Sequence, residues 1–79
     1  VNDSMHIAIT SLPGYTDEEK KMLGRRLKEA ASNLLGIMPR MVSVSVKDLP
    51  YHKWDDFITA LPDAEIVIPE GYMAKTSQN

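Results

Sequence analysis

Few side chains in this chain of 79 residues could exchange a proton or hold a small anion near neutral pH. There are two histidines, His6 and His52, and no cysteine. His6 could polarise a bound carbonyl, because imidazole titrates near neutral pH; the alternative is a hydrogen-bonded strand residue near an interface. Tyr15 could donate its hydroxyl to a carboxylate, and Arg40 could supply positive charge. We interpret His52 as a solvated residue.

Two apolar patterns separated by a helical one predict the elements that position these residues. Residues 5–12 alternate apolar and polar side chains, which predicts a half-buried strand. Residues 16–35 have apolar side chains at helical spacing; Thr16 and Glu19 form a capping box, and Gly36 follows as a helix-ending residue. Residues 41–46 alternate valine and serine, which predicts a second strand. A β-α-β unit of this kind should have parallel strands and a right-handed crossover.

The second part of the chain has weaker patterns. Apolar residues at helical spacing predict a short helix over residues 51–61. Residues 66–68 are either a short strand or an arm that packs on a partner, and residues 69–72 form a turn. We expect an amino-terminal extension over residues 1–4, one domain over 5–74 and a frayed tail over 75–79. The expected fold class is α/β (α+β), with a short second helix and a carboxyl-terminal arm.

Size and composition indicate an oligomer without a metal. Domains this small usually need a second source of stability. The lack of cysteine excludes disulfides, and two histidines without a thiolate argue against a structural zinc site. We therefore expect a homodimer or a larger homo-oligomer in which sheets join across chains. The net charge is −2 and the cations are interspersed with acids, so we expect no nucleic acid partner. No apolar run is long enough to span a membrane, and cytoplasm is the expected compartment.

The order and spacing of these segments resemble the tautomerase superfamily, specifically the 4-oxalocrotonate tautomerase-like proteins, and most closely their short dimeric PptA type. The resemblance covers residues 5–74. It is carried by the opening strand at 5–9, the Leu12-Pro13 turn, the helix start at 16–20, the strand at 42–46, Trp54 and the closing segment at 69–72.

This resemblance implies a cofactor-independent isomerase that interconverts the keto and enol forms of small 2-oxo acids. The family's acid–base group is an amino-terminal proline, whose amine has a pKa near the working pH. That position falls on Met5, whose nitrogen is here a peptide amide. The positions of the family's two arginines fall on Tyr15 and Ser43, whereas its aromatic pocket residue is matched by Trp54. The candidate pocket therefore comprises Met5, His6, Tyr15, Ser43 and Trp54, with Arg40 as a further binding residue.

Three interpretations of the amino-terminal chemistry stay open. A chain that began at Met5 would present a primary amine at the family's catalytic position. A chain that begins at Val1 has an amine that four extended residues, about 13 Å, could bring back to the pocket. In the third interpretation the base is lost, and the protein is a non-catalytic ligand-binding or assembly protein that keeps the fold.

Overall fold

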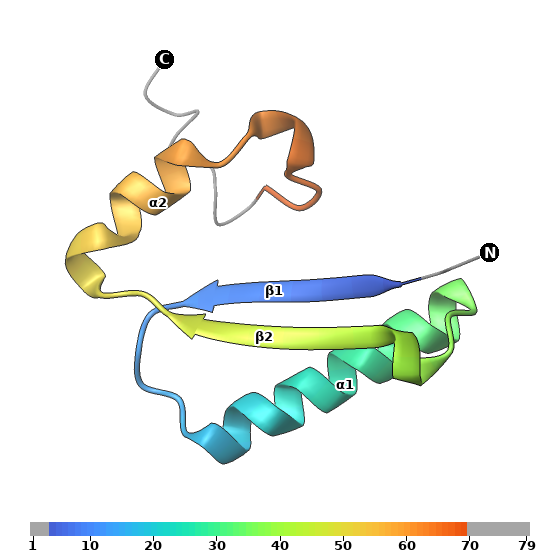
Figure 1. The fold of residues 1–79 in the computed structure, drawn as a ribbon. Helices are drawn as coiled ribbons and strands as arrows, with labels where there is room; N and C mark the ends of the chain where they lie inside the picture. The colour runs from blue at the N-terminus through green and yellow to red at the C-terminus, as the bar shows by residue number, and fades with distance from the viewer. Residues whose placement is uncertain (1–3, 70–79) are drawn as a thin grey trace. The chain divides into compact units, whose positions relative to one another are not determined.

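The structure is a computed structural model that describes residues 4–69 of the chain. The chain divides into two compact units, residues 1–49 and 50–79, which we describe separately. The first unit contains strand β1 (Met5–Ser11), helix α1 (Asp17–Leu35), a short 3-10 turn at Pro39–Met41 and strand β2 (Val42–Asp48). The predicted β-α-β order is therefore confirmed, and the fold is a mixed α/β arrangement (Figure 1).

Strands β1 and β2 form a two-stranded parallel sheet, as the sequence predicts. The register pairs Met5 with Val42, His6 with Ser43 and, at the far end, Ser11 with Asp48. The second strand begins one residue later than predicted and continues two residues further. It extends because its last residues pair with the end of β1, a tertiary contact that the valine–serine alternation does not reveal.

Helix α1 has the two ends that its sequence predicts. The Thr16 hydroxyl accepts a hydrogen bond from the Glu19 amide at 3.1 Å, and the Glu19 carboxylate accepts one from the Thr16 amide at 2.9 Å. At the other end Gly36 adopts a left-handed conformation with φ of 71°, and its amide donates to the Ser32 carbonyl. Glycine enters this region without the steric penalty of a β-carbon.

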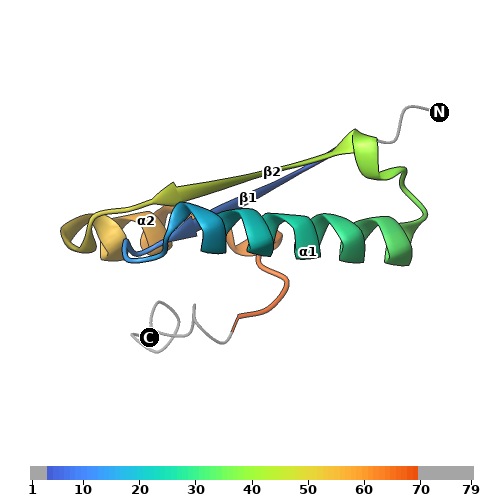
Figure 2. The ribbon, with the colours of Figure 1, turned by 90° about the horizontal axis from the view of Figure 1, so that it is seen from below.

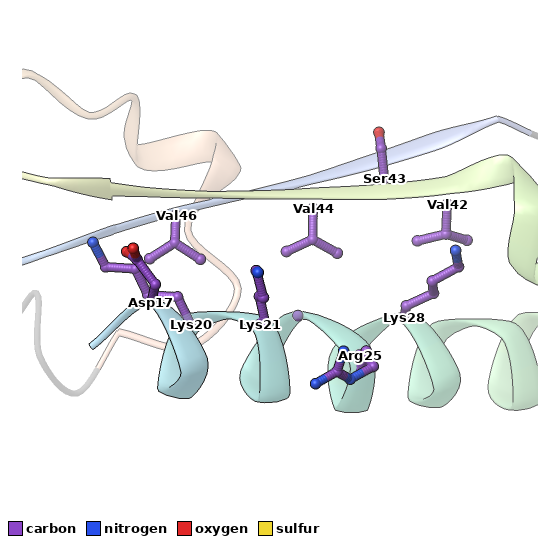
Figure 3. Close-up of a pocket in the computed structure, with 10 residues that line it drawn as sticks. Asp17, Lys20, Lys21, Arg25, Lys28, Val42, Ser43, Val44 and Val46 are labelled. Atoms are coloured by element: carbon purple, nitrogen blue, oxygen red, sulfur yellow. The ribbon is translucent and has the colours of Figure 1, made fainter. Parts of the chain in front are cut away.

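The helix covers one face of the sheet (Figures 1 and 2). Val42, Val44 and Val46 point towards it from β2 (Figure 3). The approach is close at Gly24, where an added β-carbon would lie 3.6 Å from the Val44 side chain. The opposite face of the sheet carries small and polar side chains and is exposed at His6, Ala8, Ser43 and Ser45.

The first unit buries little apolar surface. Val42 is 4% exposed, but Leu34 and Leu35, two of the apolar residues at helical spacing within 16–35, are 83% and 61% exposed. A side chain at the end of a helix is covered only where the neighbouring layer reaches it. Helix α1 therefore exposes apolar side chains at its carboxyl-terminal end.

The second unit contains a 3-10 turn at Tyr51–Lys53, helix α2 (Trp54–Ala60) and another 3-10 turn at Asp63–Glu65. The predicted short helix is thus confirmed. No strand forms at residues 66–68, so that alternative is wrong; the Ile66 amide instead donates to the Asp63 carbonyl. The arm alternative stays a prediction, and Val67 and Ile68 are 90% and 77% exposed. The predicted turn at 69–72 lies almost entirely, and the tail at 75–79 wholly, outside the described residues.

Candidate functional site

A concavity of about 350 Å³ lies at the amino ends of the two parallel strands. The opening residues of β1, Met5 and His6, contribute one side of it, and Ser43 of β2 contributes another. The turn before β2 adds Arg40 and Met41. The concavity therefore combines an imidazole, a guanidinium and a hydroxyl with two methionine side chains.

His6 is held by two hydrogen bonds across the sheet. Its Nδ1 lies 2.7 Å from the Ser43 hydroxyl oxygen, and its Nε2 lies 2.9 Å from that of Ser45. The parallel register explains the geometry, because Ser43 pairs directly with His6 and Ser45 follows two residues later on the same face. In a neutral imidazole one nitrogen donates and the other accepts, while each hydroxyl can do either. The ring is consequently oriented by a partner on each nitrogen.

Arg40 carries the positive charge of the concavity. It lies in the turn that precedes β2, and its side chain is exposed. Its only hydrogen bond within residues 4–69 is a weak contact from Nη2 to the Met38 sulfur at 3.8 Å. No described carboxylate pairs with it, so its guanidinium can bind an anion that enters the concavity.

Met5 occupies the position that the resemblance assigns to a catalytic proline amine. It is the first residue of β1 and is half-buried, pairing with Val42. Because Ser4 precedes it, its nitrogen is a peptide amide and cannot act as a base. Met5 contributes an apolar wall to the concavity instead.

The other predicted site residues lie elsewhere in the chain. Tyr15 is 61% exposed in the connection between β1 and α1. It follows the carboxyl end of β1, whose seven residues span about 20 Å from the concavity. Trp54 begins α2 in the second unit, where its ring lies 6.0 Å from that of Phe57. Val1 is outside the described residues.

Ser45 is a residue of the site that the sequence analysis missed. Its only sequence signal is its place two residues after Ser43 in an alternating strand. That spacing becomes informative once the register shows that both serines face His6. Among residues 4–69 no group of three histidine, cysteine, aspartate or glutamate side chains is arranged to hold a metal ion.

Within the described residues, no helix is both long and apolar enough to cross a membrane. Comparisons of the chain with protein-family models, with curated proteins and with solved structures gave no match.

Proposed function

We propose that this chain is a tautomerase-like protein that interconverts the keto and enol forms of small 2-oxo acids without a cofactor. The observation that carries the proposal is the single concavity that joins His6, Arg40 and Ser43 at the amino ends of β1 and β2. An enol of a 2-oxo acid presents a carboxylate, an exchangeable hydroxyl proton and an apolar side chain. The concavity offers a chemically matching group for each.

Arg40 is assigned the carboxylate. A guanidinium can make two parallel hydrogen bonds to a carboxylate, which fixes the position and the orientation of the ligand. Met5 and Met41 line the same concavity and provide the apolar contact. Its volume of about 350 Å³ lies at the small end of the usual range of about 300–1,000 Å³ for ligand sites. A small 2-oxo acid suits this size.

His6 is assigned the proton transfer, in place of the amino-terminal amine that the family resemblance implies. Neutral imidazole accepts the hydroxyl proton of the enol at Nδ1, where the enol hydroxyl takes the place of the Ser43 hydroxyl as hydrogen-bond partner, and an enolate is left. As the carbon–oxygen double bond forms, the electron pair of the carbon–carbon double bond takes the proton back from the imidazolium at carbon 3, so the keto product has the same atoms as the enol and the enzyme is unchanged. Ser43 lines the concavity beside Nδ1, whereas Ser45 holds Nε2 on the far side of the ring.

The enzyme assignment is tested by following ketonisation of phenylenolpyruvate by the full chain. We expect a rate above that of buffer, and a rate equal to buffer would exclude the activity. Acetylation of the chain's amino terminus should leave the rate unchanged, because His6 rather than an amine carries the proton. If acetylation abolishes the rate, an amine is the base and the assignment of His6 is wrong.

Arg40→Gln provides a separate test of carboxylate binding. A hydrogen bond to a charged group contributes about 1.5–3 kcal/mol, so its loss should raise KM by about tenfold or more. The matched control is Arg26→Gln, which removes the same charge from an exposed position of α1 outside the concavity. Equal KM values for the two variants would argue against Arg40 as the carboxylate ligand.

A non-catalytic assembly role is the alternative, and the exposed apolar end of α1 favours it. Leu34 and Leu35 at the end of α1 and Met38 just after it are 83%, 61% and 55% exposed, and several large apolar side chains exposed close together in the chain are typical of a protein–protein interface. We propose a homodimer on this ground. Sedimentation that shows a monomer at all concentrations would contradict it, whereas a dimer without turnover would favour assembly as the function.

A further inference from the structure

A second, larger groove lies between helix α1 and strand β2, and it shares only Ser43 with the concavity described above. Its volume is about 590 Å³. Three alternate residues of β2, Val42, Val44 and Val46, form its apolar floor. No residue of β1 lines it, so the groove follows the side of β2 that faces away from β1.

The helix contributes a cationic rim to this groove. Lys20, Lys21, Arg25 and Lys28 line it from α1 (Figure 3). Lys20 is paired with Asp48, with 2.9 Å between Nζ and Oδ2. The other three cations make no ion pair within residues 4–69, and Asp17 is the one carboxylate that lines the groove. The groove therefore has excess positive charge, although the whole chain has a net charge of −2.

The groove also runs along an open strand edge. A strand directs backbone N–H and C=O groups to both of its sides, and an unpaired side is a template for a further strand. Within the described residues β2 pairs with β1 alone, so its outer side has no strand partner. The apolar floor, the cationic rim and the open backbone edge thus follow the same stretch of β2.

We propose that this groove docks an extended acidic segment of a partner protein, which adds to the edge of β2 as a third strand. In strand addition the backbone hydrogen bonds give affinity and alternate side chains give specificity. Lys21 and Arg25 are four residues apart on α1, which is about 6 Å along a helix axis. Acidic side chains at alternate positions of a strand are about 6.7 Å apart. A segment with acids at every second position therefore matches the rim.

Other occupants fit less well. A nucleic acid requires phosphate contacts and gains little from a floor of three valines. A small anion leaves the backbone edge of β2 unused. A second copy of the chain lacks the acidic strand, because β1 and β2 together carry a single acidic residue, Asp48. An acidic extended segment is the occupant that uses the cations, the floor and the edge together.

The test uses the full chain and a seven-residue peptide in which three glutamates alternate with threonine and valine. Binding is followed by NMR at 0.15 M salt, where the Debye length is about 8 Å. We expect the largest amide shifts at residues 42–46. The same peptide with alternate backbone amides methylated should bind at least tenfold more weakly, because it cannot pair with the strand edge.

Two variants with the same change in net charge distinguish the contribution of the rim cations to binding from the contribution of the overall charge. Lys21→Gln with Lys28→Gln removes two charges from the rim and should weaken binding at least tenfold. Arg26→Glu changes the net charge by the same amount outside the groove and should alter affinity less than threefold. Equal losses in the two variants would overturn the proposal. Binding of the acidic peptide without shifts at residues 42–46, or tighter binding of a DNA duplex than of the peptide, would also overturn it.

Discussion

Ser45 gives the most specific prediction about the site, because it contacts the proposed catalytic imidazole without lining the concavity. Its hydroxyl oxygen lies 2.9 Å from His6 Nε2. Ser45→Ala removes one of the two hydrogen bonds that orient the ring. A hydrogen bond of this kind contributes about 0.5–1.5 kcal/mol, which corresponds to roughly a two- to tenfold loss of the correctly oriented ring.

We therefore expect Ser45→Ala to lower kcat for ketonisation of phenylenolpyruvate by roughly two- to tenfold, the factor that corresponds to a loss of about 0.5–1.5 kcal/mol. KM should stay the same because the Arg40 contact is intact. The free energy of unfolding should fall by less than about 1 kcal/mol, since both groups are exposed. Ser45→Thr, which keeps the hydroxyl on a good strand residue, is the control. A higher KM with normal kcat in Ser45→Ala, or the same loss in Ser45→Thr, would refute this reasoning.

Three predictions concern the helix that supports the site, each checked by chemical denaturation. Thr16→Ala removes the hydroxyl that caps α1 and should lower the free energy of unfolding by about 1 kcal/mol; no change would mean that the cap contributes nothing in solution. Ser32→Ala should raise the free energy of unfolding by about 1 kcal/mol. The buried Ser32 hydroxyl has no hydrogen bond within residues 4–69, and alanine favours the helix. A loss of stability would show that this hydroxyl has a partner in solution. Gly24→Ala should raise the free energy of unfolding by about 0.5–1 kcal/mol, because alanine favours a helix over glycine and the added methyl makes ordinary contact with Val44. Destabilisation would show that α1 and β2 are packed too closely at this position to accept a methyl group.

The elements of the first unit were predictable because local signals agree with the tertiary structure. The capping box of Thr16 and Glu19 and the glycine at position 36 define both ends of α1 without any long-range contact. The alternation of valine and serine identifies the buried side of β2. These are short-range patterns, and a single sequence contains them in full.

The site was only partly predictable because its geometry depends on pairing between distant residues. His6 and Ser45 are 39 positions apart, and the register of β1 against β2 brings them together. Arg40 was a candidate by its charge alone, and the turn before β2 places it beside His6. From the sequence, the cations of α1 were described only as interspersed with acids, because the sequence does not show that four of them line one groove beside β2.

The proposed proton transfer by His6 is tested most directly by the rate of phenylenolpyruvate ketonisation in His6→Gln. Glutamine has an amide that can hydrogen-bond to a serine hydroxyl, but it cannot accept a proton near neutral pH. General acid–base catalysis contributes about 10²–10⁴-fold, so we predict a loss of that size with an unchanged circular dichroism spectrum. A variant that retains the full rate of the unmodified chain would contradict the assignment of His6 as the catalytic group.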